Sequence, residues 1–359
     1  MKNKLGDMLN IRTGKLDANA SSLNGKYPFF TCSKEPLKID TYSYDCECVL
    51  VAGNGDLNVK YYNGKFDAYQ RTYILEKKND DLYMPYLYYF MEKYIDTLRS
   101  QSIGGVIKYI KLENITDAKI ELLPKDEQVR ICKILDKVKS SINSQKHQLQ
   151  KLETLIKARF VEMFGDPISN SKNYKLKKLI ELGELGRGVS KHRPRNDPKL
   201  LGGKYPLIQT GDVANADTYI KSYSNTYSEM GLQQSKMWRE GTLCITIAAN
   251  IASTAIMLFD ACFPDSVVGF NANGEVDNIY IHYWFTFFQS ILEKQAPAVA
   301  QKNINLQILS ELKVIVPNKS DIKSFAVFVK EVEKLKFDVQ KSLEKTQMLF
   351  DSLMQEYFR

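Results

Sequence analysis

The sequence predicts an α+β protein in which two mixed α/β domains are separated by two long helices that pair as an antiparallel coiled coil. Three observations predict this class: an internal duplication, a heptad pattern after each copy, and alternating strand-like and aromatic helical runs inside each copy. The duplication also predicts a pseudo-twofold internal repeat. The 359 residues exceed one average core and are enough for two domains.

The duplication is visible in short landmarks that return in the same order. LGD at residues 5–7 returns as LGE at 182–184, and GKYP at residue 25 returns 178 residues later. The strand-like run that ends at Pro124 has a counterpart that ends at Pro317, 193 residues later. Because the offset grows, the second copy carries a net insertion. The two copies share landmarks near their ends but differ in sequence between them. This favours two domains that perform the same task on two different targets.

A heptad pattern follows each copy. Ten positions in each segment step by four and three residues, eight of the ten are apolar, and an offset of 194 relates the two segments throughout. This spacing is the seam of a coiled coil. Thirteen of the sixteen apolar seam residues are taken as the predicted seam: Ile131, Leu135, Val138, Ile142, Leu149, Leu152 and Ile156 in the first segment and Val329, Val332, Val339, Leu343, Phe350 and Leu353 in the second.

Each predicted helix needs a partner, and the simplest partner is the other helix. A helix over residues 131–163 is about 50 Å long, and its narrow apolar face is not stable alone. The intervening domain is long enough for the chain to return, which favours antiparallel pairing with one domain at each end. The alternative is that each helix packs on its own domain or on a helix of another chain.

The predicted boundaries follow from these patterns. We place the first α/β domain at 1–123, the first helix at 124–165, a linker at 166–173, the second α/β domain at 174–317 and the second helix at 318–359. Strands rich in β-branched residues are expected at 48–52, 71–75, 243–248, 254–259 and 314–316, and aromatic core helices at 83–94 and 279–292.

Composition and motifs argue against several classes of protein. No run of eighteen apolar residues and no apolar N-terminal stretch occurs, and the six scattered cysteines lack zinc-site spacing, so we expect a cytoplasmic protein with reduced thiols. No phosphate loop or dinucleotide-binding motif is present, and three scattered histidines predict neither a metal site nor a catalytic triad. The net charge of +8 permits nucleic-acid binding, although a lysine-rich solvated surface would give the same charge.

The polar loops hold the candidate contacts to DNA. The segment 186–196 carries Arg187, Lys191, Arg193 and Arg195 between glycine and proline residues, and such side chains contact phosphates or guanine edges. Any of the other polar loops could also be an ordinary solvated surface loop. The basic segment is the loop that we favour as a DNA contact. The remaining candidates, chosen for amide, hydroxyl or basic groups, are Lys15, Asn54, Asn58, Lys60 and Lys108 in the first domain and Gln209, Thr210, Asn250, Ser253, Thr254, Gln301, Lys302 and Asn303 in the second.

The junctions between domain and helix resemble those of the specificity subunits of Type I restriction–modification systems. SIGG at residue 102 and EQVRI at residue 127 flank a strand and a proline, and FVEMFGDP at 160–167 resembles the end of the family's central helix. GGKYPLIQTGDV at 202–213 is similar to the start of the family's target recognition domain. The second junction departs from the pattern, because NKSDIK without a Glu–Gln pair follows Pro317.

The resemblance implies that each domain is a target recognition domain for one half of an interrupted, asymmetric DNA sequence, with the coiled coil setting the gap. It also implies docking of two methyltransferase subunits, which bring S-adenosylmethionine, and of two motor-nuclease subunits, which use ATP and Mg. This chain would then be a non-catalytic subunit that binds no cofactor and no membrane. The alternatives are the specificity module of a methyltransferase-only system, an enzyme in its own right, or a coiled-coil adaptor that binds protein and shows no salt-dependent DNA affinity.

Overall fold

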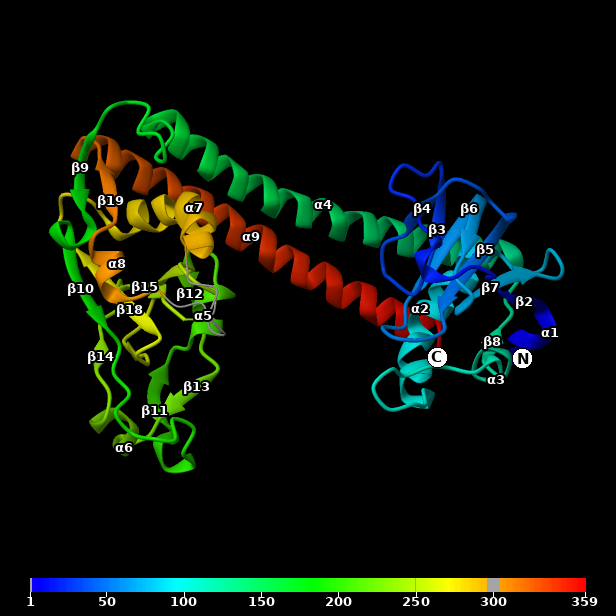
Figure 1. Cartoon of the computed structure of the whole chain (residues 1–359). Coiled ribbons are helices and arrows are strands. Elements are labelled where there is room, and N and C mark those ends of the chain that lie inside the picture. The colour runs from blue at the N-terminus through cyan, green and yellow to red at the C-terminus, as the bar shows by residue number, and fades with distance from the viewer. Residues whose placement is uncertain (1, 249, 296–303) are drawn as a thin grey trace. The chain divides into compact units, whose positions relative to one another are not determined.

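The computed structural model describes residues 2–248, 250–295 and 304–359, and the chain divides into two compact units (Figure 1). Unit 1 consists of Met1–His147 and Gln340–Arg359, and unit 2 consists of Gln148–Val339. Each unit therefore combines one α/β domain with one half of each of two long helices, α4 (Lys125–Phe164) and α9 (Lys319–Tyr357).

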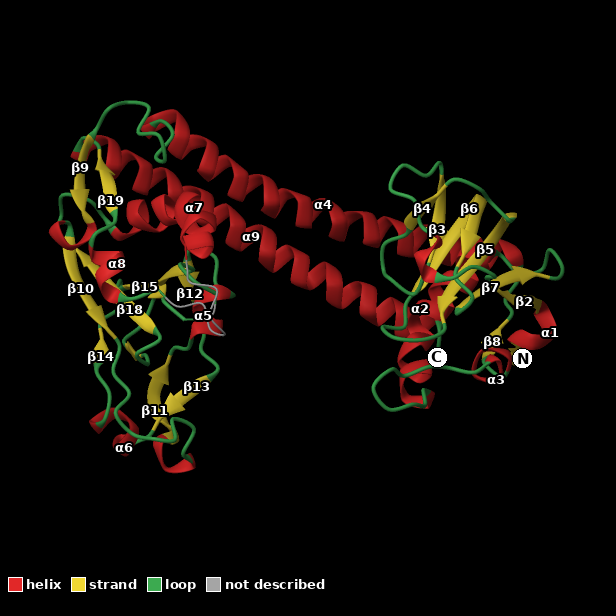
Figure 2. Ribbon diagram, viewed as in Figure 1, coloured by secondary structure: helices red, strands yellow, loops and turns green. Residues whose placement is uncertain are grey.

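A six-stranded sheet forms the centre of unit 1 (Figure 2). In spatial order its strands are β2 (Leu9–Thr13), β7 (Thr72–Lys77), β5 (Tyr44–Ala52), β6 (Val59–Ala68), β3 (Tyr27–Phe30) and β4 (Leu37–Ile39). All neighbours are antiparallel except β3 and β6. The aromatic helix α2 (Met84–Gln101) packs against β5 and β6. The remaining elements are β1 (Lys2–Lys4), which pairs with β8 (Lys119–Glu121), and the short helices α1 (Leu5–Met8), η1 (Ala18–Ala20) and α3 (Leu112–Thr116).

Unit 2 distributes its strands over two main sheets. The five-stranded sheet has the order β10 (Gly183–Arg187), β18 (Val267–Ala272), β15 (Leu243–Thr246), β16 (Thr254–Met257) and β12 (Tyr219–Ile220). The four-stranded sheet has the order β13 (Asn225–Tyr227), β11 (Leu201–Leu207), β17 (Ala261–Cys262) and β14 (Met237–Trp238). The remaining elements are β9 (Lys175–Lys178), which pairs with β19 (Lys313–Val316), the aromatic helix α7 (Asn278–Gln295), and the short helices η2 (Leu179–Glu181), η3 (Pro198–Leu200), α5 (Thr210–Ala214), α6 (Glu229–Gln233) and α8 (Leu306–Ser310).

The two units repeat one strand order. The antiparallel series β2-β7-β5-β6 corresponds to β10-β18-β15-β16. The parallel pair β3 and β6, with Phe29 opposite Asp67, corresponds to β11 and β17, with Leu207 opposite Cys262. The long strand β6 is thus divided into β16 and β17 in unit 2, and the single sheet becomes two. The elements α5, β12, α6 and β14 lie in the residues that lengthen the second copy.

The long helices run antiparallel, because opposite ends of α4 and α9 pack together in each unit. In unit 1, Ile131 and Leu135 of α4 share a core with Met354 of α9. In unit 2, Phe160 of α4 shares a core with Phe325 of α9. All thirteen apolar seam residues predicted above are buried or half-buried.

The amide of Gln128 explains one residue of the junction motif. This side chain is fully buried, its Oε1 accepts from the backbone N–H of Tyr83, and its Nε2 donates to the carbonyl oxygens of Asp81 and Leu123, all at 2.8 Å. It thereby joins α4 to the start of α2 and the end of β8. The equivalent residue of α9, Ile322, is buried in an apolar core, so the second junction has no need of a Glu–Gln pair.

Replacement of Gln128 by alanine should weaken unit 1 around α2. We expect the local free energy of opening to fall by about 2 to 4 kcal/mol, because three backbone groups in part-buried hydrogen bonds lose their partner. Hydrogen exchange of the α2 amides measures this change. Gln355→Ala, at an exposed position of α9, is the control, and equal exchange in the two variants would contradict the prediction.

Candidate nucleic-acid interface

In unit 2 two of the polar loops predicted from the sequence, the basic segment and the loop that holds Asn250, lie at one end of the five-stranded sheet. The register pairs Arg187 at the end of β10 with Val268 near the start of β18, and Thr246 at the end of β15 with Val267. β16 begins at this same end, at Thr254. The topology therefore places the loop after β10 beside the β15–β16 turn, although about sixty residues separate them in the sequence.

The basic loop, defined here as residues 187–197, is folded around Asp265. The guanidinium groups of Arg193 and Arg195 both pair with the Asp265 carboxylate, the former at 3.5 Å, and Arg187 Nε donates to its backbone carbonyl. Arg193 also donates to the carbonyl oxygens of Ser190 at 2.6 Å and His192 at 2.8 Å. The arginines nevertheless stay accessible, since the side chains of Arg193 and Arg195 are 54% and 47% exposed.

A second set of contacts holds the backbone of the basic loop. Gln234 Oε1 accepts from the backbone N–H groups of Lys191 at 2.7 Å and His192 at 3.1 Å. Gly188 lies against the chain before β18, where a Cβ atom would stand 2.3 Å from the carbonyl oxygen of Pro264. Asp265, Gln234 and Gly188 thus fix the loop, and only the basic side chains were evident as candidates from the sequence.

The β15–β16 turn presents Asn250 on a constrained backbone. The buried hydroxyl of Thr246 donates to the carbonyl of Asn250 at 2.5 Å and accepts from the N–H of Ser253 at 3.1 Å. Asn250 and Ala252 have φ of 35° and 59°, a region that costs most residues about 1 to 3 kcal/mol and that concentrates at functional sites. Asn250 is exposed and Ser253 is half-buried, so both are accessible at the sheet end.

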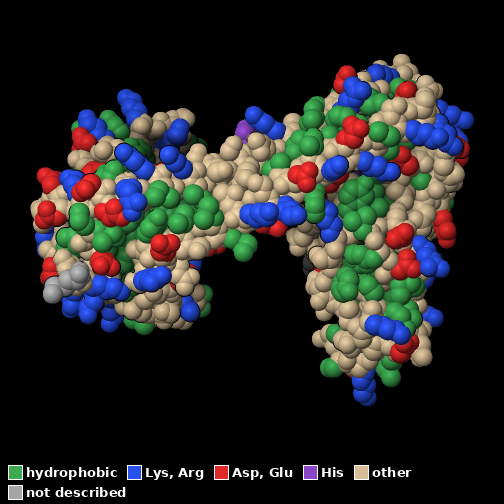
Figure 3. Space-filling model, turned by 180° about the vertical axis from the view of Figure 1, so that it is seen from behind, with side chains coloured by type: hydrophobic (Ala, Val, Ile, Leu, Met, Phe, Trp, Pro, Cys, Tyr) green, Lys and Arg blue, Asp and Glu red, His purple; other side chains and the backbone are tan. Residues whose placement is uncertain are grey.

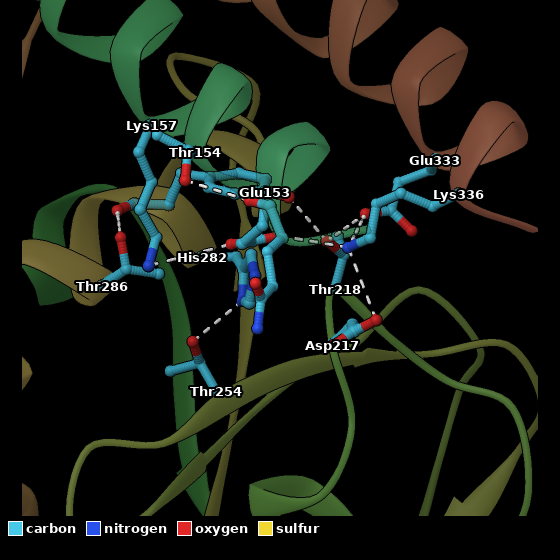
Figure 4. Close-up of polar contacts among 12 residues, drawn as sticks. Glu153, Thr154, Lys157, Asp217, Thr218, Thr254, His282, Thr286, Glu333 and Lys336 are labelled. Atoms are coloured by element: carbon cyan, nitrogen blue, oxygen red, sulfur yellow. Dashed lines mark hydrogen bonds and ion pairs between the residues drawn. The ribbon is translucent and has the colours of Figure 1, made fainter. Parts of the chain in front are cut away.

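A buried polar network lies beside this turn (Figure 4). Lys336 of α9 is 6% exposed, and its Nζ lies 2.9 Å from Glu333, 3.1 Å from Glu153 of α4 and 3.4 Å from Asp217. Burial lowers the pKa of Lys336, but the hydrogen bond to Glu333 and the charges of the three carboxylates outweigh it, so the net shift is upward. The hydroxyl of Thr218 joins the network by donating to Glu333 at 2.9 Å.

Thr254 belongs to the core and not to the surface. It is 8% exposed, and its hydroxyl lies 2.9 Å from Nδ1 of His282. The pKa of His282 is lowered to about 4, mainly by burial and to a smaller extent by the positive charges of Lys336 and Lys157. The ring is therefore neutral near pH 7. The two residues line a pocket of about 270 Å³ together with Glu153 and Ser253. We leave Thr254 out of the interface, because its burial leaves no surface for a base edge.

Unit 1 gathers its candidate residues at the corresponding sheet end. The strands β2, β5 and β7 meet there, with Thr13 opposite Tyr73 and Ala52 opposite Thr72. Lys15 and Asn54 follow β2 and β5, and Lys15 is exposed. A small hairpin adds Lys108, whose carbonyl oxygen accepts from the N–H of Gly55 at 2.9 Å.

Arg71 is a further candidate that no motif indicated. It directly precedes β7, is exposed, and its carbonyl accepts from the N–H of Gly53 at 2.8 Å, so it lies next to Asn54. Its place before β7 is equivalent to the place of Asp265 and Ser266 before β18. The duplication, applied to individual strands, is the signal that would have identified this position.

Asn58 and Lys60 are turned into unit 1. Asn58 Nδ2 donates to the carbonyl oxygens of Cys32 and Asp56, both at 2.8 Å, and Lys60 donates to Asn58 Oδ1. Burial lowers the pKa of Lys60. Because these groups are used within the domain, we leave both residues out of the interface.

The remaining predicted DNA contacts of the second domain lie at α5 or in residues that the structure does not describe. Gln209 is exposed at the cap of α5, and Thr210 is half-buried at its first turn, and α5 packs on β15 and β16. Gln301, Lys302 and Asn303 lie outside the described residues. Figure 3 shows Lys and Arg side chains interspersed with Asp and Glu on the face in view, so charge alone does not mark the interface there.

The described part of the chain shows neither a cluster of metal-binding side chains nor a helix suited to cross a membrane. Its His, Cys, Asp and Glu side chains form no group of three or more that could hold a metal ion. None of its helices combines the length and the apolar character needed to cross a membrane.

The family model described as the Type I restriction modification DNA specificity domain matches residues 1–154 and 171–346. The chain therefore belongs to the family of Type I restriction–modification specificity subunits, with one such domain in each half. The EcoDI specificity subunit of Escherichia coli is 37% identical over 154 residues, which are 43% of this chain and 34% of that subunit. The match thus spans about a third of the length of that relative.

Further relatives cover more of the chain. The MjaVIII specificity subunit of Methanocaldococcus jannaschii is 22% identical over 319 residues, 80% of this chain and 72% of that subunit. Among solved structures, the S subunit of a Type I system from M. genitalium is similar in fold, with a TM-score of 0.67 and 14% identity over 100% of this chain and 96% of that one. The structural likeness supports the α+β fold with two repeated domains and two long helices.

Proposed function

We propose that this chain recognises DNA for a Type I restriction–modification complex, with each unit reading one half of an interrupted, asymmetric target. The observation that carries the proposal is the repeated sheet end: the same four strands present basic and amide side chains at the same end in both units. The residues differ between the units, with Lys15, Arg71 and Asn54 in one and the basic loop and Asn250 in the other. Different side chains at equivalent places favour two different half-sites.

The long helices are proposed to set the gap between the half-sites and to dock two methyltransferase subunits. Exposed apolar side chains along α9 would supply contact area for such docking. Leu335 and Phe337 of α9 are each 54% exposed in unit 2, and Met348 is 71% exposed in unit 1. S-adenosylmethionine would come with the methyltransferase subunits, and ATP and Mg with two motor-nuclease subunits.

Sequencing of methylated adenine in genomic DNA tests the proposal, in cells with this gene intact and with it deleted. We expect deletion to remove methylation from one interrupted, asymmetric motif. Retention of every methylated motif, with the partner methyltransferase demonstrably expressed, would overturn the proposal and favour a coiled-coil adaptor that binds protein. Loss of methylation without any change in restriction of foreign DNA would indicate a methyltransferase-only system.

A further inference from the structure

We propose that Arg187, Arg193 and Arg195 form a binding site for one backbone phosphate of DNA, and that Asp265 positions their guanidinium groups for it. The inference rests on the proposed function, since it concerns the same sheet end. Asp265 was not among the residues that the sequence indicated, and it would contribute without touching the DNA itself.

The arginine cluster, formed by Arg187, Arg193 and Arg195 around Asp265, has an excess of positive charge that favours binding of an anion. Three guanidinium groups contact Asp265, two of them at its carboxylate, and Arg187 donates to its backbone carbonyl, so the charge of Arg187 has no counterion in that contact. Lys191 adds a fourth exposed cation from the same loop. A base edge is neutral and would leave this excess positive charge uncompensated, whereas a phosphate diester carries the missing negative charge.

The hydrogen-bonding capacity of the cluster is also only partly used. A guanidinium group has about five N–H donors in a planar fork. The described contacts of the three arginines comprise one bond from Arg187, three from Arg193 and one from Arg195. One edge of each guanidinium is held by the protein, and the half-exposed groups keep donors for the two free oxygens of a phosphate.

Positioning is the contribution of Asp265. Its side chain is 27% exposed, and it brings arginines from two places in one loop onto the two oxygens of its carboxylate. Side chains that are already ordered lose less conformational freedom on binding. A phosphate contact of this kind fixes the register of the protein on the duplex, so it favours the correctly aligned complex over binding at random.

The first test is the salt dependence of binding to a random-sequence duplex, with the full chain in its methyltransferase complex. Each phosphate contact contributes about 0.9 to the slope of log K against log salt. We expect Arg195→Gln to reduce the slope measurably, by no more than about one because Arg187 and Arg193 still face the same phosphate, while Arg195→Lys largely keeps it. The matched control is Arg239→Gln, because Arg239 is 88% exposed and paired with Asp260 at 2.9 Å in the same unit.

The second test separates positioning from charge. Asp265→Asn and Asp260→Asn each remove one negative charge from unit 2, so general electrostatics predicts the same modest gain in DNA affinity for both. We expect Asp265→Asn to keep or increase affinity for the random duplex. The same variant should bind a duplex that contains the motif identified by methylation sequencing at least about threefold more weakly. Asp260→Asn should change both affinities equally.

Two results would overturn the inference. An unchanged salt slope for Arg195→Gln would remove the phosphate site, and equal effects of Asp265→Asn on target and random duplexes would remove the positioning role. Both are distinct from failure of the proposed function, which would be seen as absence of salt-dependent DNA binding by the wild-type complex. Tryptophan fluorescence verifies that each variant is folded, since both tryptophans lie in unit 2.

Discussion

Deletion of one heptad from each long helix should shorten the unread gap of the DNA target by about three base pairs. Seven helical residues span about 10 Å, and duplex DNA rises about 3.4 Å per base pair. Residues 142–148 and 339–345 are suitable, because Gln145 and Ser342 at their centres are hydrogen-bonded at 2.8 Å. Removing a whole heptad preserves the four-three spacing of the seam on either side.

Sequencing of DNA methylated by the variant complex measures the gap directly. The two half-sites should be unchanged, since neither sheet end is altered. Deleting four residues from each helix is the control, because it breaks the seam and should abolish methylation. A variant that lacks one heptad but methylates the wild-type motif with the wild-type gap would show that the helices do not set the spacing.

Replacement of Lys336 by alanine should reduce the free energy of unfolding of unit 2 by about 3 to 5 kcal/mol. Removing one member of a buried ion pair costs this much because the remaining charge loses its compensation. Here Glu333 is 8% exposed and would lose its ion pair with Lys336, and Lys157, 3.9 Å from Glu153, would be the cation left near this group among the described ion pairs. Denaturant unfolding followed by tryptophan fluorescence reports on unit 2, which holds both tryptophans.

Two further variants show whether charge or packing causes the loss. Lys336→Met combined with Glu333→Gln keeps most of the volume and removes the uncompensated charge, so we expect it to cost much less than Lys336→Ala alone. Lys334→Ala, at an exposed position of the same helix, should change stability by less than about 0.5 kcal/mol. A small effect of Lys336→Ala would mean that water or movement of Glu333 compensates the lost cation.

The contrast between Ile142 and Lys336 shows how the two copies have diverged. They occupy equivalent seam positions 194 residues apart, one apolar and 5% exposed, the other charged and 6% exposed. The seam pattern correctly predicts that both side chains face inward, but it does not predict which carboxylates meet the lysine. Glu153 comes from α4 and Asp217 from the chain before β12, and only the folded unit brings them to Nζ.

The sequence was sufficient for the features that repeat at short range or in parallel copies. Apolar seam residues recur every three or four positions, so the two long helices could be predicted. A duplication preserves landmarks in order, so the two α/β domains and the family resemblance could be predicted as well. The basic loop was also evident, because its three arginines and its lysine lie within a short stretch of the chain, from Arg187 to Arg195.

Only the tertiary structure decided which polar side chains face solvent and which distant ones act together. Asn58, Lys60 and Thr254 are polar or basic like their exposed neighbours, but in the folded chain their side chains bond to partners within their own unit. Asp265 and Gln234 lie about seventy and forty residues beyond the loop that they hold. The role of Asp265 depends on the antiparallel pairing of β10 with β18, and that of Gln234 on the position of the residue that ends α6. No local pattern encodes these contacts, because they form only when the whole unit is assembled.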